Sequence, residues 1–316
     1  MFTSIVASLL STMAPAAVAA PERNVEIAGP KGPLAGTLRG TAAPVVLMIP
    51  GSGPTDRDGN NPLGVKAAPY RLLAQALGER GITTLRIDKR GMFGSKAATA
   101  DGNDVKIADY AADAHAWAAE ARRLTGARCV WLAGHSEGSL VALLAGQDPK
   151  DLCGIISIAG AGRRFSVLMR EQLRANPGNA PILEPALAAI DTLEKGGTVD
   201  AEALPKPLLA LFSPSLQPYL RDLFSHDPVQ LAAQLKLPLL IIQGGRDLQV
   251  RTEDADLLHA AQPSSTITII PEANHVLKVV PVDDPTANFA SYGEEGKPLA
   301  PGIAEAIAAF VGNTDR

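Results

Sequence analysis

A serine flanked by glycines is the residue best placed to do chemistry in this sequence. It lies in Gly134-His135-Ser136-Glu137-Gly138, a G-x-S-x-G motif between an apolar run typical of a buried strand and one typical of a helix. In that context the glycines allow a sharp turn, which holds the serine in a strained conformation above the end of a sheet. The motif predicts that the Ser136 hydroxyl is a nucleophile.

A serine hydroxyl needs a base to take its proton, and histidine is the usual one. Of the five histidines, His275 comes directly after the last predicted strand, in a loop. Active sites of parallel sheets lie at the carboxyl ends of the strands, so His275 is the predicted base. Asp247 also follows a predicted strand. It is the predicted acid that orients the imidazole and stabilises its charged form.

The other histidines and the acids near Asp247 have plainer interpretations. His135 lies inside the motif, and its side chain is expected to point away from the nucleophile. The remaining candidates fall on predicted helices or in a helical insertion: His115, His226, His259, Asp254 and Asp256.

An acyl-transfer serine also needs hydrogen-bond donors for the oxyanion. The backbone N–H of Glu137, next to the nucleophile, is one predicted donor. The second is expected in the loop Pro50-Gly51-Ser52-Gly53, which follows another apolar strand. Ser52 is the preferred donor, with Gly53 next, although the same glycines would also serve a plain turn.

The elements that must position these residues alternate between strand and helix, which favours a mostly parallel sheet. The predicted strands span residues 25–27, 34–38, 44–49, 83–87, 129–133, 154–159, 237–243 and 266–270. The predicted helices between and after them span residues 67–80, 105–124, 139–145, 254–260 and 303–311.

The alternation stops between about residues 162 and 236, which are rich in Leu and Ala with scattered Pro. Short helices are predicted there at residues 165–175, 183–193, 208–212, 217–224 and 228–235. We therefore expect an α/β core in two parts, residues 21–161 and 237–316, with a helical cap at 162–236. The apolar side chains of the cap suit an apolar substrate or packing on the core, and packing is favoured for most of them: Phe165, Leu168, Met169, Leu211, Phe212, Leu220 and Phe224.

Composition and charge exclude several classes of partner. The formal net charge is -4 and no long Lys/Arg cluster is present, so nucleic acid is not an expected partner. Beyond the N-terminus no apolar segment is long enough to cross a bilayer. No dinucleotide fingerprint, P-loop motif or clustered set of metal ligands is present, so neither a cofactor nor a metal is expected. The expected partner is a small acyl substrate, and the oligomeric state is left open.

The N-terminus and the cysteines bear on the cell compartment. Residues 1–20 are apolar and small and end in Ala-Val-Ala-Ala, which resembles a secretory signal peptide and predicts an exported, periplasmic or secreted protein. An exported enzyme could pair Cys129 with Cys153, but the favoured interpretation is two small buried hydrophobic side chains.

Two charged clusters lie beside the predicted site. Asp56, Arg57 and Asp58 follow the oxyanion loop, and Asp88 and Arg90 follow the next strand. Both clusters are predicted to brace their loops by mutual hydrogen bonds, because such loops must satisfy their backbone polar groups.

Several segments together resemble the α/β-hydrolase superfamily, and more closely its bacterial lid-bearing esterase branch, which is often grouped with serine aminopeptidase-like hydrolases. They are PGSGPTDRDGN (residues 50–60), RIDKRGMFGS (86–95), GHSEGS (134–139), FSPSLQPYLRDLFSHDP (212–228), QGGRDLQV (243–250) and NHVLK (274–278).

The resemblance implies an α/β-hydrolase fold, with a central eight-stranded sheet and a helical cap inserted after the sixth strand. It implies a catalytic Ser136, Asp247 and His275, in the chain order of this fold, with oxyanion donors at Ser52 and Glu137. Many relatives have His-Gly where this chain has Pro50-Gly51, which leaves the second oxyanion donor less firmly assigned than the triad.

The predicted activity is hydrolysis of carboxylic esters through an acyl-enzyme. An aminopeptidase-like peptidase is the nearest alternative, because the same residues serve amides, and Glu137 or a cap acid such as Asp222 could bind a free amine. A thioesterase is a further alternative. A non-catalytic binding protein on the same scaffold is disfavoured, since such proteins usually lack a member of the triad.

Overall fold

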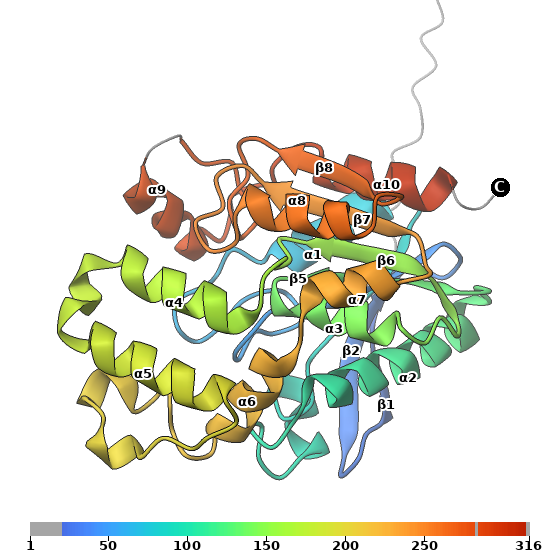
Figure 1. Ribbon diagram of the computed structural model, residues 1–316. Helices are drawn as coiled ribbons and strands as arrows, with labels where there is room; N and C mark the ends of the chain where they lie inside the picture. The colour runs from blue at the N-terminus through green and yellow to red at the C-terminus, as the bar shows by residue number, and fades with distance from the viewer. Residues whose placement is uncertain (1–20, 282–283, 314–316) are drawn as a thin grey trace, which may run out of the picture.

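The computed structural model describes residues 21–281 and 284–313, so the predicted signal peptide lies outside the described residues. One sheet of eight strands crosses the molecule in the order β1-β2-β4-β3-β5-β6-β7-β8 (Figure 1). From β4 to β8 all neighbouring strands are parallel, whereas β1 and β2 form an antiparallel hairpin at one edge. The strands are β1 (Glu22–Ala28), β2 (Pro33–Arg39), β3 (Val45–Ile49), β4 (Thr83–Ile87), β5 (Val130–His135), β6 (Leu152–Ile158), β7 (Leu239–Gly244) and β8 (Thr266–Ile270).

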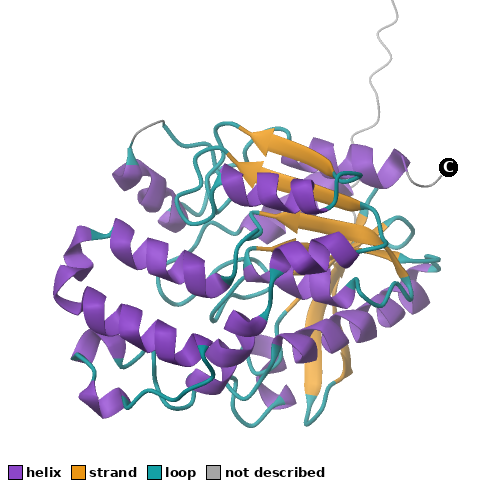
Figure 2. Ribbon diagram, viewed as in Figure 1, coloured by secondary structure: helices purple, strands orange, loops and turns teal. Residues whose placement is uncertain are grey.

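Helices cover both faces of this sheet (Figure 2). Those of the core are α1 (Pro69–Gly78), α2 (Ile107–Thr125), α3 (Glu137–Ala145), α8 (Thr252–Ala261), α9 (Pro285–Ala290) and α10 (Ile303–Asn313). Buried side chains of α2, α3 and α8 belong to one hydrophobic cluster, and those of α1 and α10 to another. The mostly parallel, helix-flanked sheet predicted from the sequence is confirmed.

Strand β3 shows why the central strands read as continuous apolar runs. All five of its residues are buried. Val45, Leu47 and Ile49 face the cluster with α2 and α3, whereas Val46 and Met48 face the cluster with α1 and α10. Side chains alternate between the faces of a strand, so a strand covered on both sides must be apolar at every position.

Four helices stand between β6 and β7: α4 (Phe165–Ala175), α5 (Leu183–Glu194), α6 (Gln217–Ser225) and α7 (Pro228–Gln234). Helices α4, α5 and α6 contact one another and lie together beside the sheet (Figure 1). Helix α7 contacts α3 and α8 and so returns the chain to the core. Strand alternation stops here and helices replace it, as predicted, but residues 209–212, predicted to be helical, form a turn after the short 3₁₀ helix Lys206–Leu208.

The interpretation of the cysteines as unpaired was wrong. Cys129 and Cys153 form a disulfide across a separation of 24 residues. They stand at the starts of β5 and β6, which are paired parallel strands, so the pairing of the strands brings the two side chains together. Within the part of the chain that the structure describes, no helix is long and apolar enough to span a bilayer.

Candidate active site

The turn between β5 and α3 has the form that the G-x-S-x-G motif predicts. A Cβ atom at Gly134 would lie 2.0 Å from the carbonyl oxygen of Gly138, and one at Gly138 would lie 2.3 Å from the carbonyl oxygen of Ile49. Both positions must therefore be glycine. Between them Ser136 has φ 54° and ψ -119°, a conformation that L-residues rarely adopt.

Ser136 is held by its backbone while its side chain stays free of the helix. Its N–H donates to the carbonyl of Ile158 on β6, at 2.9 Å. It precedes the first residue of α3, yet its hydroxyl makes no capping hydrogen bond to that helix. The side chain is partly exposed, whereas its neighbours His135 and Glu137 are buried.

Asp247 and His275, predicted from strand ends, lie together beyond the ends of the neighbouring strands β7 and β8. Nδ1 of His275 donates to Oδ2 of Asp247 at 2.7 Å. The other carboxylate oxygen of Asp247 accepts from the backbone N–H groups of Gln249 and Val250, at 2.8 and 3.0 Å. Because these bonds fix the carboxylate and the carboxylate fixes the ring, Nε2 of His275 is left as the proton-accepting nitrogen.

Ser136 and His275 line one small cavity of about 110 Å³. Among the described residues no hydrogen bond joins the Ser136 hydroxyl to the His275 ring. Such bonds are often long in ligand-free enzymes and tighten when substrate binds. The three residues chosen from the sequence thus come together from positions far apart in the chain.

Both residues predicted to supply oxyanion donors lie beside Ser136. Glu137 is the first residue of α3, so its backbone N–H has no acceptor within the helix. Ser52 lines a cavity together with Ser136 and Glu137. The N–H of Gly51 is unavailable, since it donates to the Tyr70 hydroxyl at 3.1 Å. This leaves Ser52 and Gly53 as the candidate donors of the loop.

His135 was expected to point away from Ser136, yet it lines the same small cavity as Ser136 and His275. Its Nδ1 lies 2.8 Å from the hydroxyl of Tyr70, and its Nε2 lies 2.8 Å from the backbone carbonyl of His275. A carbonyl only accepts, so Nε2 carries the proton and Nδ1 accepts from Tyr70. Burial lowers the pKa of His135 to about 3, helped by the nearby His275, and keeps the ring neutral.

Tyr70 is a residue that the sequence analysis missed. It lies at helical spacing with Leu73 and Leu77 in α1, and all three side chains are buried. Its hydroxyl accepts from Gly51 and donates to His135, so one chain of hydrogen bonds joins the oxyanion loop to the backbone of His275. Nothing in the sequence around Tyr70 indicates that its hydroxyl makes these two hydrogen bonds rather than that its ring only packs in the core.

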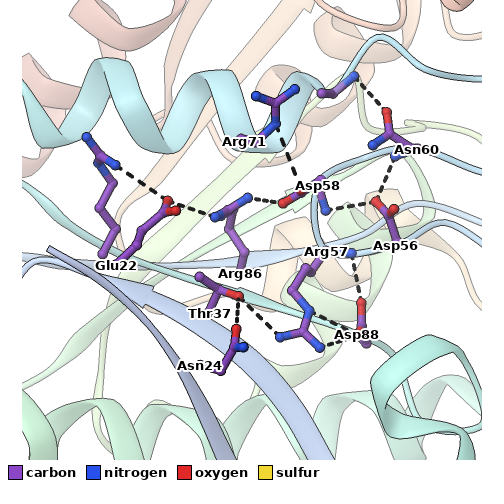
Figure 3. A network of polar contacts seen from close by, with 12 residues as sticks. Glu22, Asn24, Thr37, Asp56, Arg57, Asp58, Asn60, Arg71, Arg86 and Asp88 are labelled. Atoms are coloured by element: carbon purple, nitrogen blue, oxygen red, sulfur yellow. Dashed lines mark hydrogen bonds and ion pairs between the residues drawn. The ribbon is translucent and has the colours of Figure 1, made fainter. Parts of the chain in front are cut away.

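The charged clusters beside the site brace their loops, as predicted (Figure 3). Arg57 donates to Asp88 from Nε, Nη2 and its backbone N–H, at 3.0, 2.6 and 2.9 Å. Asp58 pairs with Arg86, which also reaches Glu22 at 2.9 Å. These contacts tie the loop after β3 to β4 and to the edge hairpin.

A second cavity, of about 580 Å³, opens beside Ser136 on the side of α4 and α6. All seven apolar side chains singled out in the sequence lie in or pack against the hydrophobic clusters, as favoured for most of them. Five of the seven also line this cavity: Phe165, Leu168, Met169, Leu211 and Leu220. Phe212 and Phe224 are fully buried in the core instead. The cavity is therefore apolar on the side of these helices and polar near Ser136, where Lys89, Tyr110 and Glu137 line it.

The loop that carries His275 is supported by a helix that the sequence analysis did not predict. Asn274 Nδ2 donates to Oδ1 of Asn288 on α9 and to the hydroxyl of Ser291, at 3.2 and 2.7 Å. Helix α9 begins with Asp284 capping and Pro285 in the first turn, a helix-start signal that could have revealed it. No group of three or more metal-ligating side chains occurs within residues 21–281 and 284–313.

Comparison with known proteins defines the class. A family model described as "Alpha/beta hydrolase family" matches residues 46–291. The chain belongs to the α/β-hydrolase family, and its eight-stranded sheet is the sheet of that fold.

The individual proteins that match this chain are distant relatives. Esterase EstD of Thermotoga maritima is 25% identical over 265 residues, which cover 81% of this chain and 60% of EstD, so the chain spans about 60% of the length of this curated relative. The α/β hydrolase GrgF of Penicillium sp. superposes with a TM-score of 0.59 at 20% identity, covering 93% of this chain and 99% of that one. The Pyrococcus furiosus esterase Pf2001 superposes with a TM-score of 0.57 at 15% identity, covering 93% of each chain.

Proposed function

We propose that the protein is a serine hydrolase that cleaves carboxylic esters of small molecules through an acyl-enzyme, with Ser136 as nucleophile, His275 as base and Asp247 as the orienting acid. The observation that carries the proposal is the 2.7 Å hydrogen bond between Asp247 and His275, whose ring shares a cavity with the strained Ser136. The similarity to an esterase of Thermotoga maritima supports the choice of ester substrates.

The proposed reaction follows from this arrangement. His275 Nε2 takes the proton of the Ser136 hydroxyl as Oγ attacks the ester carbonyl, and the oxyanion accepts hydrogen bonds from the N–H groups of Ser52 and Glu137. The C–O bond to the alcohol breaks as His275 returns the proton to the leaving oxygen. Water then attacks the acyl-enzyme by the same route, releasing the acid and restoring Ser136.

We also propose that residues 162–236 act as a cap over the acyl group. The 580 Å³ cavity beside Ser136 is walled by side chains of α4 and α6, and it is large enough for an acyl chain of several carbons. An apolar wall favours an apolar acyl group, since burying each methylene contributes about 0.8 kcal/mol.

Labelling with a fluorophosphonate probe tests the proposed nucleophile. We expect native protein to be labelled and the Ser136→Ala variant to remain unlabelled. Undiminished labelling of the variant, or no labelling of native protein, would exclude Ser136 as the nucleophile and favour a binding protein on this scaffold.

Comparing p-nitrophenyl acyl esters with aminoacyl p-nitroanilides and acyl thioesters tests the substrate class. We expect esters to have the highest kcat/KM. The acids considered for binding a peptide amine are already engaged, which supports this choice. Glu137 pairs with Lys89 at 3.0 Å, and Asp222 accepts from the backbone N–H of Ile107 at 2.8 Å. Faster anilide turnover would overturn the ester assignment.

Export to the periplasm or medium is proposed on two observations. Residues 1–20 resemble a signal peptide. The disulfide between Cys129 and Cys153 suits an oxidising compartment, since cytosolic thiols are normally kept reduced. Intact-mass measurement on protein purified from a periplasmic extract tests this, and a mass that still includes Met1–Ala20 would count against it.

A further inference from the structure

A buried ion pair lies beside the proposed oxyanion loop. Lys89 and Glu137 pair at 3.0 Å, and their side chains are only 2% and 0% exposed. Lys89 lies two residues past the end of β4, and Glu137 follows Ser136 at the end of β5. Strand β3, which leads into the oxyanion loop, runs between these two strands. The pair therefore spans the base of that loop.

Lys89 makes a second, shorter contact with the loop itself. Its Nζ donates to the backbone carbonyl of Gly51 at 2.6 Å, and the ammonium lies 5.1 Å from the centre of the Tyr110 ring. A buried cation is costly unless charge and hydrogen bonds compensate it, and here a carboxylate, a carbonyl and an aromatic face surround it.

The contacted carbonyl belongs to the peptide unit that carries the proposed second oxyanion donor. The C=O of Gly51 and the N–H of Ser52 are two ends of one planar trans group and point in opposite directions. A cation that fixes the carbonyl oxygen therefore fixes the direction of the Ser52 N–H. It also draws electron density toward that oxygen, which strengthens the N–H as a donor.

The same ion pair reaches the other donor. Glu137 supplies its backbone N–H to the proposed oxyanion site, and its side chain holds Lys89. We propose that Lys89 is a positioning residue that clamps both oxyanion donors, by joining the Gly51 carbonyl to the Glu137 carboxylate. This inference rests on the proposed function, because it assigns Lys89 a task in the same reaction.

The test compares Lys89→Met with the double variant Lys89→Met/Glu137→Gln. Lys89→Met leaves the Glu137 carboxylate buried without its cation, so both stability and catalysis should fall. The double variant removes both charges and should regain thermal stability, but the Gly51 carbonyl still lacks its donor. In both variants we expect kcat for a p-nitrophenyl ester to fall about 10- to 100-fold, somewhat less than the loss of a whole oxyanion donor, with KM changed less than about threefold.

Arg90→Met provides the matched control. Arg90 follows Lys89 in sequence and forms its own part-buried ion pair with Asp113, with both hydrogen bonds at 2.7 Å. This pair does not line the cavity beside Ser136. The control should lose stability while keeping kcat at the native value.

Two results would overturn the inference. One is native kcat in Lys89→Met. The other is a double variant that recovers kcat together with its stability, which would make the pair merely structural. If Lys89→Met does not fold, the double variant alone decides. Fluorophosphonate labelling of native protein distinguishes failure of the Lys89 inference from failure of the proposed function. If native protein is neither labelled nor active on esters, the proposed function is wrong, and so is the role of Lys89.

Discussion

The Nε2–H of His135 donates to the backbone carbonyl of His275 at 2.8 Å, so the residue before the proposed nucleophile holds the residue proposed as its base. The other nitrogen of the same ring accepts from Tyr70, which in turn accepts from the N–H of Gly51. The turn that carries Ser136, the loop that carries His275 and the oxyanion loop are thereby joined by one chain of hydrogen bonds. Every group in this chain has one consistent role as donor or acceptor.

Replacing Tyr70 with Phe tests whether this chain serves catalysis. The substitution keeps the ring that packs in α1 but leaves the Gly51 N–H and Nδ1 of His135 without partners. We expect a loss of unfolding free energy of about 1–3 kcal/mol, the usual cost of an unsatisfied buried group. We also expect kcat to fall about tenfold, because the loop before Ser52 loses an anchor. Chemical unfolding and steady-state kinetics measure the two effects, and an unchanged kcat would restrict Tyr70 to stability.

The neutral His135 predicts a specific acid sensitivity. Its pKa is lowered to about 3 in the folded protein by burial, whereas an unfolded histidine titrates near 6.5. The unfolded state therefore binds this proton first, so the stabilising contribution is complete above pH 6.5 and is lost as the pH falls toward 3. The loss is about 1.4 kcal/mol per pH unit at most.

A His135→Gln variant isolates this contribution. Glutamine cannot take up the proton, so its unfolding free energy should fall less steeply between pH 6.5 and 4.5 than that of native protein. Urea unfolding at several pH values within this window gives both slopes. Equal slopes would mean that other groups cause the acid sensitivity.

The sequence predicted those parts of the fold and site that depend on local pattern. Strands β3, β5, β6 and β7 were recognisable because they are buried on both faces and so consist mostly of apolar residues. Ser136 and Asp247 were found because each follows such a run, and His275 because it follows β8, a strand of Thr and Ile. Their convergence could be expected, since parallel strands end at the same edge of a sheet.

The features that were missed depend on which strands become neighbours. Cys129 and Cys153 pair because β5 and β6 are adjacent, which no spacing along the chain reveals. Lys89 looks like an ordinary loop lysine until the order β4-β3-β5 brings it into contact with the Gly51 carbonyl. A single polar contact made across the sheet leaves no periodic trace in the sequence.

Asp88→Asn tests the bracing of the loop after β3. The Asp88 carboxylate is 2% exposed and accepts from the Arg57 side chain, from the Arg57 backbone and from Gly94 N–H. Breaking a buried ion pair on one side is costly, and we expect a loss of about 3 kcal/mol in unfolding free energy. Glu120→Gln, which breaks the surface pair with the largely exposed Arg123, is the control and should leave stability nearly unchanged. Similar losses in both variants would contradict the argument.

Removing the disulfide should separate stability from activity. The double variant Cys129→Ala/Cys153→Ala frees a loop of 24 residues, and loops of this size correspond to about 3 kcal/mol of stabilisation. The bond lies at the start of β5, whereas Ser136 follows the end of that strand. We expect a lower Tm with native kcat at 25 °C, measured beside native protein with and without reductant. A loss of kcat in folded protein would show that the disulfide also affects the turn that carries Ser136.

Met169→Trp tests whether the cavity beside Ser136 receives the acyl chain. Met169 lines this cavity from α4, and the larger indole would occupy part of its 580 Å³. Long acyl chains must then be excluded or bent, whereas an acetyl group should still fit. We expect kcat/KM for a p-nitrophenyl octanoate to fall about tenfold or more, as the loss of burial for two or more methylenes implies. The acetate ester should change less than about twofold.

Val167→Trp is the matched control. Val167 lies on the same helix, is 37% exposed and does not line the cavity, so this substitution should leave kcat/KM for both esters unchanged. If Met169→Trp slows both esters equally, the acyl chain must bind elsewhere and the helices between β6 and β7 must have another role.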